Sequence, residues 1–481
     1  MYKQLLGFLI ISVGLRILTF FRSVIDHDES TYLVIGDAIL HGARYWVDII
    51  DVKPVGVFWL YAGFLGVFGH SIAAMRLMAA IFLGLTAFLL SKTKLAMGST
   101  PGAAFGAGLI FLILNSVYTY YGVSPNTETF FTFFTMLAFW MALRSTTIFA
   151  WGLAGLAFGL GFIIKYVVMF DAIALGFFLL INPSMGLPRR IWGLAAMALG
   201  AALPFACVFA CYAYWGATDK FIFHTFMVSK NYPVDASFWA HIKSFADLNL
   251  RFLPFALLYY LTFAYPKTLP PVRRLGILWS LAAIVPVLLP GKFFGHYYIQ
   301  FFLPFSFVAG EFFSRPIEET PRFLRPFFRR NIAVPLLVTA LVLNFYFQKK
   351  DYIDRQDTPA ELAKMLRPKL KRGDLVYAGN YHHILYFLLD RPSPSPYVHR
   401  SLLWTEEHRN ALNIQVDDEI QRIFAADPVF VIVQDSIPHL LFNERLKEKY
   451  TAQTRIKTEN GRAVLLYAKQ KSQQSEQNQQ Q

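Results

Sequence analysis

A short run of acidic side chains directly follows the first apolar segment of the chain. Asp26, Asp28 and Glu29 lie in the stretch DHDESTY, residues 26–32. Charged groups are costly beside lipid, so acids at the edge of an apolar segment should face water, a cavity or a partner. A carboxylate placed beside a hydroxyl or amine can take its proton as that group attacks a sugar carbon, which makes Asp28 and Glu29 candidate general bases. The alternative interpretation is a solvated loop after a membrane helix.

Candidate cations lie beside the ends of other apolar segments. Lys53 precedes Pro54 at the far end of the same polar loop, where a lysine can neutralise a phosphate as a compact point charge. Lys292, His296 and Tyr297 stand at the entrance to a later segment and suit an anionic headgroup. The alternatives are a lysine that snorkels to lipid headgroups and aromatic residues of a membrane interface.

Four further residues are candidates for contacts with a substrate. Asn126 and Glu128 open another apolar segment, although an acid in the first turn of a helix can simply complement the helix dipole. Lys165 stands at the break between two segments, and Tyr32 closes the acidic stretch. Weaker loop candidates are Asp51, His224, Lys230 and Tyr232. The sequence contains no Walker loop, nucleotide-binding glycine pattern or zinc-ligand spacing.

Composition indicates which elements must position these groups. Of 481 residues, 55% are hydrophobic and only 16% are charged, whereas a soluble protein carries roughly a quarter charged residues. Apolar runs of about 20 residues recur over the first 347 positions, which predicts a polytopic helical membrane protein. The net charge of +14 falls mostly in short loops, where it sets topology and does not indicate nucleic-acid binding. Cys207 and Cys211 lie one helical turn apart in an apolar run and are predicted to be packing residues.

The predicted fold is mainly α: a transmembrane bundle over residues 1–348 with a small extracytoplasmic α/β domain at its C-terminal side. A polar outer loop covers 22–55, and the short apolar run at 56–69 predicts a helix at the membrane interface. We predict about eleven spans, at 4–21, 72–91, 104–120, 127–144, 148–164, 166–182, 191–214, 252–265, 275–290, 297–313 and 331–347.

Loop charges predict the orientation. Lysines and arginines concentrate in alternate loops, which belong in the cytoplasm by the positive-inside rule. The acidic stretch, Lys53, Lys165 and everything after residue 348 then share the opposite face, so the candidate groups gather on one side of the membrane. The predicted cytoplasmic set is Lys92, Lys94, Arg144, Arg189, Arg190, Lys267, Arg273, Arg274, Arg315, Arg322, Arg325, Arg329 and Arg330.

Residues 349–469 differ in character from the apolar part. They predict helices at 358–370, 406–425 and 437–448, the first of them opened by a capping box with proline in its first turn. Short apolar runs predict strands at 375–378, 429–433 and 463–467. Residues 470–481 are rich in glutamine and are predicted to be disordered.

The order of these motifs resembles the GT-C glycosyltransferases of the protein O-mannosyltransferase type. Bacterial aminoarabinose transferases and rhizobial galacturonosyltransferase-like proteins belong to the same group. The resemblance covers residues 1–347, and five loose motifs in the right order are together fairly specific. The motifs are Asp28-Glu29-Ser30-Thr31-Tyr32, Lys53-Pro54, Phe68-Gly69-His70-Ser71 with Arg76, Asn126-Thr127-Glu128, and His296-Tyr297-Tyr298 followed by Leu303-Pro304.

The resemblance implies a polyprenyl-phosphate sugar donor, built on undecaprenyl phosphate in a bacterium, and a transfer that inverts the sugar carbon. Asp28 would be the catalytic base, Lys53 with Lys292 or His296 would hold the donor phosphate, and Glu128 would shape the acceptor side. The acceptor would be lipid A, another envelope glycan or a protein. The site would face the periplasm from the inner membrane. No metal is predicted, although a divalent ion remains open.

Two positions depart from the pattern, and other classes of protein are open. Val52 stands where the aminoarabinose transferases carry an acid, and Thr31 where they carry an arginine, which argues against that sugar and against a metal between loop residues. The main alternative is a flippase or transporter of a lipid-linked sugar, but the sequence shows no convincing internal repeat. A polymer ligase should carry arginine in a large outer loop, and 215–250 has none. A non-catalytic scaffold would leave the clustered acids unexplained.

Overall fold

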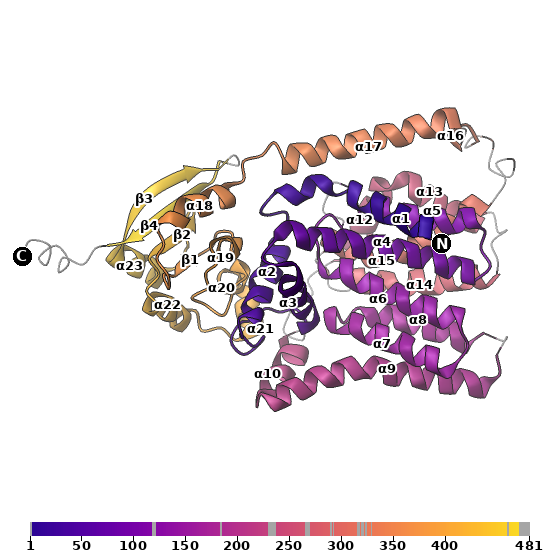
Figure 1. Ribbon diagram of the computed structural model, residues 1–481, viewed down its shortest axis with the longest axis horizontal. Coiled ribbons are helices and arrows are strands. Elements are labelled where there is room, and N and C mark those ends of the chain that lie inside the picture. Colours follow the sequence, from indigo (N-terminus) through magenta and orange to yellow (C-terminus); the bar gives the residue numbers. More distant parts are fainter. Residues whose placement is uncertain are drawn as a thin grey trace, which may run out of the picture.

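The protein consists of a long helical bundle with a small α/β domain at one end (Figure 1). The computed structural model describes residues 2–117, 122–182, 185–228, 237–264, 270–288, 291, 293–314, 318, 322, 325–328, 330–458 and 461–470.

Every predicted span overlaps a helix of the bundle, which confirms the predicted fold class, although the span predicted at 4–21 divides into α1 and the short helix η1 (Ile17–Phe21). The bundle helices are α1 (Tyr2–Gly14), α4 (Ile72–Ala96), α5 (Pro101–Leu114), α6 (Thr127–Arg144), α7 (Ile148–Ile164), α8 (Val168–Leu180), α9 (Leu187–Tyr214), α13 (Leu253–Ala264), α14 (Pro270–Leu288), α15 (Tyr298–Gly310) and α17 (Arg330–Tyr352). Of the described helices, α4, α9 and α14 are long and apolar enough to cross a membrane by themselves. Six others are apolar but shorter, α1, α5, α7, α8 and α13 among them.

The predicted outer loop at 22–55 contains a helix that the sequence analysis did not predict. This helix, α2 (His27–Leu40), begins where the Asp26 side chain accepts a hydrogen bond from the Asp28 N–H at 3.1 Å. Asp28 and Glu29 in its first turn complement the helix dipole. The predicted interfacial helix is α3 (Val55–Phe68), and Figure 1 places α2 and α3 at the end of the bundle that faces the α/β domain.

Shorter elements connect the bundle helices. They are η1 (Ile17–Phe21), α10 (Thr218–Ile222), the π-helical turn η2 (Phe223–Met227), α12 (Phe238–Arg251), η3 (Gly295–Tyr297), η4 (Glu311–Ser314) and α16 (Arg325–Phe328). Of these, η3 bears on the candidate site, since it carries His296 and Tyr297.

The α/β domain contains a sheet of four strands in the order β1-β2-β4-β3, of which only the β1–β2 pair is parallel. The predicted helix at 406–425 is in fact two helices, because Asn413 adopts a left-handed conformation (φ 53°) between them. The polar edge strand β3 was not predicted. The elements are α18 (Thr358–Leu366), η6 (Arg367–Lys369), β1 (Val376–Ala378), α19 (Ile384–Leu389), α20 (Arg400–Trp404), α21 (Glu406–Leu412), α22 (Val416–Ala425), β2 (Phe430–Gln434), α23 (Leu440–Lys449), β3 (Tyr450–Lys457) and β4 (Ala463–Lys469).

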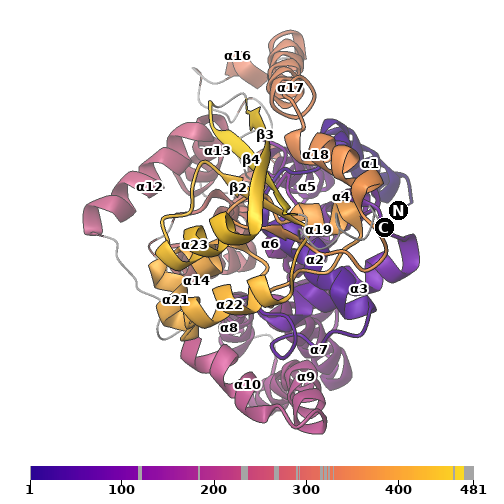
Figure 2. The same ribbon diagram turned by 90° about the vertical axis from the view of Figure 1, so that its left-hand side faces the viewer.

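The α/β domain covers one end of the bundle, as the end-on view shows (Figure 2). The first outer loop holds it there: the Ile50 N–H donates to the Pro396 carbonyl at 2.8 Å, and the Ser23 N–H donates to Asp357 at 2.7 Å. The acidic stretch therefore lies between the bundle and the domain. The predicted disordered tail lies outside the described residues beyond Gln470.

Of the predicted cytoplasmic residues, those that the structure describes at the end of α4, at the end of α6 and at the start of α9 lie at the opposite end of the bundle (Figure 1). Lys94 was predicted to be a charged residue of a cytoplasmic loop, but its side chain is fully buried in the last turn of α4. Its Nζ lies 2.5 Å from Glu311 Oε1 and donates to the Phe307 carbonyl at 2.7 Å. A buried ammonium needs such partners, so Lys94 joins two helices and does not act as a topology signal. Lys267, Arg315 and Arg329 lie outside the described residues.

Candidate active site

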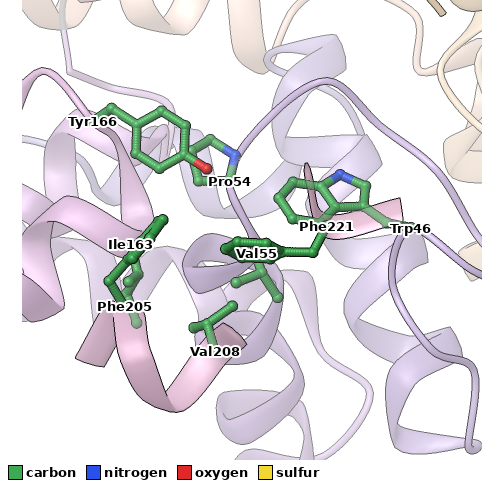
Figure 3. A pocket seen from close by; sticks show the side chains of 8 residues that line it. All are labelled: Trp46, Pro54, Val55, Ile163, Tyr166, Phe205, Val208 and Phe221. Atoms are coloured by element: carbon green, nitrogen blue, oxygen red, sulfur yellow. The ribbon is translucent and has the colours of Figure 1, made fainter. Parts of the chain in front are cut away.

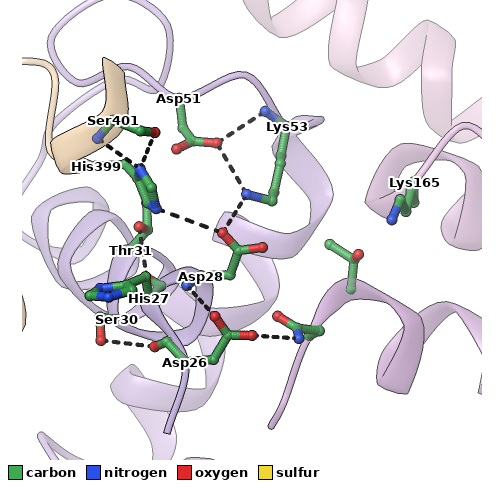
Figure 4. Close-up of polar contacts among 12 residues, drawn as sticks. Asp26, His27, Asp28, Ser30, Thr31, Asp51, Lys53, Lys165, His399 and Ser401 are labelled. Atoms are coloured by element: carbon green, nitrogen blue, oxygen red, sulfur yellow. Dashed lines mark hydrogen bonds and ion pairs between the residues drawn. The ribbon is translucent and has the colours of Figure 1, made fainter. Parts of the chain in front are cut away.

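Asp28 and Lys53 form an ion pair at the junction between the bundle and the α/β domain (Figure 4). Lys53 Nζ donates to Asp28 Oδ1 at 3.0 Å, and the two side chains are 23% and 20% exposed. Helix α2 positions the acid, and the turn before Pro54 positions the lysine. A base candidate and a phosphate-binding candidate are thus in contact while both keep access to solvent.

The surroundings of this pair hold both groups in their charged forms. Burial raises the pKa of Asp28. Lys53, His399 and His296 together lower it by more than burial raises it, so the net pKa lies below its usual value. Burial likewise lowers the pKa of Lys53, while the carboxylates of Asp28 and Asp51 raise it above its usual value. Each charge therefore stabilises the other, and Asp28 is ionised and able to accept a proton at neutral pH.

Asp51 and Tyr32 also contact the Lys53 side chain. Asp51 is buried, accepts the Lys53 backbone N–H at 3.2 Å, and lies 3.7 Å from Lys53 Nζ. The ring of Tyr32 lies under the same ammonium, with its centroid 5.3 Å from Nζ. Tyr32 is fully buried, so the structure gives it a supporting position under Lys53 and no open surface for the predicted substrate contact.

Glu29 faces away from Asp28 and is engaged on both oxygens. Arg76 Nε donates to Glu29 Oε1 at 2.6 Å and Arg76 Nη2 donates to Oε2 at 2.7 Å, with both side chains 1% exposed. Both carboxylate oxygens are thus turned toward Arg76 in a site closed to solvent. The interpretation of Glu29 as a second catalytic base therefore does not fit this arrangement, and its position is that of a brace between α2 and α4.

Asn126 ties the acidic stretch to the start of α6. Its side-chain Nδ2 donates to Asp26 Oδ2 at 2.9 Å, and Asn126 is 1% exposed. The other oxygen of Asp26 caps α2. Asn126 thus makes a structural contact through Nδ2, and its predicted substrate-binding role stays a prediction.

A second ion pair lies beside the first. Glu128, in the first turn of α6, contacts Lys165 Nζ through Oε1 and accepts from the Thr127 hydroxyl at 2.8 Å through Oε2. Lys165 follows α7 and is 23% exposed, and its Nζ lies 4.3 Å from the centroid of the Tyr297 ring. Two solvent-accessible ammonium groups thus face the same junction, Lys53 from the turn before α3 and Lys165 from the end of α7.

Of the remaining sequence candidates, the structure describes His296 and His224. His296 lies beside Tyr297, with ring centroids 4.8 Å apart, and is close enough to lower the pKa of Asp28. His224 stacks on Trp46 at 5.3 Å and is buried in packing. Lys292, Lys230 and Tyr232 lie outside the described residues.

The α/β domain contributes histidines that the sequence analysis missed. His399 Nε2 lies 3.9 Å from Asp28 Oδ1. His383 Nε2 donates to the His27 carbonyl at 3.0 Å and lies 2.8 Å from the Thr31 hydroxyl. His382 stacks on His27 at 4.8 Å. Only tertiary contact brings these histidines to the acidic stretch. The one sign in the sequence was the pair of adjacent histidines at 382–383.

An apolar pocket lies behind Pro54, on the bundle side of the ion pair (Figure 3). Its volume is about 10 Å³, which is room for a single water molecule at most. The wall beside Lys53 is therefore closed packing of aromatic and aliphatic side chains. The lining residues are Trp46, Pro54, Val55, Ile163, Tyr166, Phe205, Val208 and Phe221.

The whole chain superposes on a known membrane-protein fold. The crystal structure of ArnT from Cupriavidus metallidurans in the apo state matches it with a TM-score of 0.65, at 15% sequence identity, over 96% of this chain and 97% of that one. The chain therefore has the fold of that protein. The match includes the α/β domain as well as the bundle, since nearly all of both chains is covered.

Sequence comparisons find similarity over a shorter region. The family profile of dolichyl-phosphate-mannose-protein mannosyltransferases matches residues 52–215, which contain Lys53, Glu128 and Lys165. An undecaprenyl phosphate-alpha-4-amino-4-deoxy-L-arabinose arabinosyl transferase of Pseudomonas savastanoi pv. phaseolicola is 31% identical over 154 residues, 29% of this chain and 28% of the relative. A second transferase of that name, from Pseudomonas fluorescens, is 30% identical over 183 residues, 34% of this chain and 29% of the relative. The aligned segment thus spans less than a third of either relative.

Proposed function

We propose that the chain is a membrane glycosyltransferase that moves a sugar from a polyprenyl-phosphate donor to an acceptor in the cell envelope. The observation that carries the proposal is the partly exposed Asp28–Lys53 ion pair under the α/β domain. An ionised carboxylate and an ammonium in contact are the two groups that this reaction needs at one point. The GT-C fold and the names of the relatives support the same reaction class.

The reaction fits the pair atom by atom. The acceptor hydroxyl or amine attacks the anomeric carbon while the bond from that carbon to the phosphate oxygen breaks, so the carbon inverts. The acceptor's proton passes to Asp28, and the electron pair leaves on the polyprenyl phosphate. Lys53 faces the growing negative charge as a compact cation, and Lys165 offers a second one nearby.

The proposed location is the outer face of a bacterial inner membrane, with undecaprenyl phosphate as the lipid of the donor. The basic loops at the end of the bundle away from Asp28 support this orientation. Lipid A, another envelope glycan and a protein hydroxyl are the proposed classes of acceptor. The aminoarabinose named for the relatives is one possible sugar, and Thr31 and Val52 stand against it.

The test is transfer of label from a radiolabelled undecaprenyl-phosphate sugar pool in membranes that contain the protein. Asp28→Asn keeps the size of the side chain and removes its charge. We expect it to lower transfer by about 10²- to 10⁴-fold, the usual contribution of a general base. Asp48→Asn is the matched control, because Asp48 lies in the same loop but pairs with the exposed Arg44 at 3.0 Å.

Three outcomes separate the proposal from its main alternative. Transfer by wild type and Asp48→Asn, lost in Asp28→Asn at equal expression, supports a transferase with its base at Asp28. Equal transfer by all three would remove Asp28 from the reaction. Movement of an intact lipid-linked sugar across the membrane without any transfer would favour a flippase instead.

A further inference from the structure

A second cluster of charged side chains lies about the far end of α2, away from Asp28. It consists of Asp37 on α2, His70 at the corner between α3 and α4, and Asp390 after α19 of the α/β domain. One ligand atom from each of the three lies within 4.8 Å of the others. The cluster borders a cavity of about 600 Å³ that opens at the junction. None of these residues belongs to the proposed glycosyltransferase site.

His70 is oriented by a backbone carbonyl. Its Nε2 lies 2.8 Å from the Phe387 carbonyl oxygen, and its ring stacks on Phe387 with centroids 3.5 Å apart. A carbonyl oxygen only accepts, so the hydrogen of the neutral imidazole is on Nε2. Nδ1 then carries a lone pair, and that lone pair faces Asp37 Oδ1 at 3.4 Å. A hydrogen bond from the other ring nitrogen to a carbonyl is the usual support of a metal-binding histidine.

This geometry requires a positive charge between the two side chains. A lone pair and a carboxylate oxygen repel each other at that distance unless a proton or a metal ion lies between them. A proton on His70 would satisfy Asp37 alone, but Asp390 converges on the same point from another domain. Of the neighbouring cations, Arg367 donates to the Leu388 carbonyl at 2.5 Å. His41 Nδ1 donates to the Asp37 carbonyl at 2.9 Å and lies 3.7 Å from Asp37 Oδ2, so it leaves Oδ1, the oxygen that faces His70, to another partner.

We propose that Asp37, His70 and Asp390 bind a divalent transition-metal ion, with Zn²⁺ as the best match. One imidazole nitrogen and two carboxylate oxygens form a borderline ligand set, which suits zinc better than the all-oxygen sets of magnesium or calcium. Three protein ligands leave a fourth position, which opens on the 600 Å³ cavity and can hold water or an anionic group.

The three ligands come from parts of the chain that are far apart in sequence. An ion bound to all three joins α2, the α3–α4 corner and the α/β domain at one point. It acts as a clip that holds the domain over the end of the bundle. Asp28, Asp37 and Lys53 all belong to the outer loop at 22–55. The bound ion would therefore hold the α/β domain against the part of the bundle that carries Asp28 and Lys53, whatever reaction occurs there.

The test uses full-length protein in detergent, stripped with EDTA and titrated with Zn²⁺. We expect a single saturable site by calorimetry, and a thermal midpoint that rises by several degrees with Zn²⁺ and falls with EDTA. His70→Ala and Asp390→Asn should each lose the site and the shift. His439→Ala is the matched control, because His439 pairs with only one carboxylate, Asp417, at 3.4 Å.

The outcomes decide between a metal and a proton. Zn²⁺ binding by wild type and His439→Ala, weakened at least tenfold in Asp390→Asn, supports the site. An EDTA-insensitive wild type with no saturable Zn²⁺ binding would overturn it and leave a protonated His70 between two acids. Should His70→Ala fail to fold, Asp390→Asn and the EDTA response of wild type still decide, and neither measurement depends on transferase activity.

Discussion

The Nζ atom of Lys53 lies 3.0 Å from Oδ1 of Asp28, across the two ends of one outer loop. Helix α2 carries the acid and the turn before Pro54 carries the lysine, so the loop between them folds back on itself. Asp51 and the Tyr32 ring also contact the Lys53 ammonium and hold it in place. A phosphate that approaches Lys53 must therefore arrive next to the carboxylate, which is the arrangement that couples proton acceptance to departure of the phosphate.

Removal of the Lys53 charge should impair transfer more than a change in its shape. Lys53→Met keeps the length of the side chain but leaves the developing phosphate charge without its cation, and we expect the transfer rate to fall by about 10²- to 10³-fold. Lys53→Arg retains the charge but spreads it over a planar group, so partial activity should remain. Initial rates with labelled donor in membranes measure both.

Lys220→Met is the control for this pair of variants. Lys220 is 55% exposed on α10 and makes only a surface contact with Asp219 at 3.9 Å. Its loss should leave the rate unchanged. A Lys53→Met protein as active as Lys220→Met would exclude a phosphate-binding role for Lys53.

The pH dependence of transfer should report the contact between Lys53 and Asp28. The net pKa of Asp28 lies below its usual value of about 3.9, so the carboxylate stays ionised as pH falls to that point. Stability from the pair is accordingly present above pH ~4 and is lost only as pH falls through the lowered folded-state pKa. Wild-type transfer should show no acid limb from Asp28 between about pH 5 and 7.

In Lys53→Met the burial of Asp28 remains while its main counter-charge is gone. Burial raises a carboxyl pKa, so the acid limb should move upward in pH, even though the residual rate is low. His399 and His296 also face Asp28 and will offset part of this rise. Rate profiles normalised to their maxima give the comparison, and coincident wild-type and variant profiles would contradict the argument.

The buried Glu29–Arg76 pair should matter for stability more than for catalysis. Arg76→Met leaves an uncompensated carboxylate in a site that is 1% exposed, and such a loss costs about 3–5 kcal/mol. Arg76 also donates to the carbonyls of Thr19 and Arg22, which would lose their partner. The double variant Glu29→Met with Arg76→Met should recover part of the loss, because no charge is then buried alone. Thermal midpoints in detergent compare both variants with wild type.

A different result would change the assignment of Glu29. If Glu29→Gln unfolded at the wild-type midpoint yet abolished transfer, the acid would act in the reaction after all. We expect the reverse order of effects: a lower midpoint with transfer reduced in proportion to the folded fraction.

Sequence patterns predicted the spans well, because long apolar runs in a membrane protein allow little besides helices. They did not predict α2, because its residues 27–40 carry no strong apolar periodicity. Residues 29–36 of this helix are buried, and α2 packs against α3 and against α19 of the α/β domain. They missed β3 for a related reason, since YTAQTRIK is a polar edge strand that forms only against β4. Burial of Lys94 was also invisible, because its partner Glu311 is far away in the sequence.

For the site, the sequence supplied the residue types and the order but not their partners. Asp28 and Lys53 meet as the motifs suggested. The sequence does not distinguish Glu29 from Asp28; the contact of Glu29 with Arg76 does. The sequence likewise does not show that Asn126 contacts Asp26. These assignments depend on helix rotation and tertiary contact, which adjacent letters do not encode.

His399 should position Asp28 from the α/β domain. The Ser401 N–H donates to His399 Nδ1 at 3.2 Å, so the neutral ring carries its hydrogen on Nε2, the atom that lies 3.9 Å from Asp28 Oδ1. Burial lowers the pKa of His399, while the Asp28 carboxylate opposes this effect. His399→Leu should lower kcat several-fold, and His399→Gln, which can still donate, should restore part of it. Loss of KM alone, with kcat unchanged in both variants, would argue against this role.

Two glycines of α7 offer a matched test of how tightly the bundle is packed. A Cβ at Gly155 would lie 2.0 Å from the Met197 carbonyl oxygen of α9, whereas one at Gly152 would meet its nearest neighbour, the Ala196 carbonyl oxygen, at 3.8 Å. Small residues let membrane helices approach this closely, and the backbone of α9 cannot move aside for one methyl group without loss of other contacts. Gly155→Ala should therefore lower the thermal midpoint by several degrees, while Gly152→Ala should leave it unchanged or raise it slightly through helix propensity. Equal midpoints for the two variants would mean that α7 and α9 lie farther apart than the structure places them.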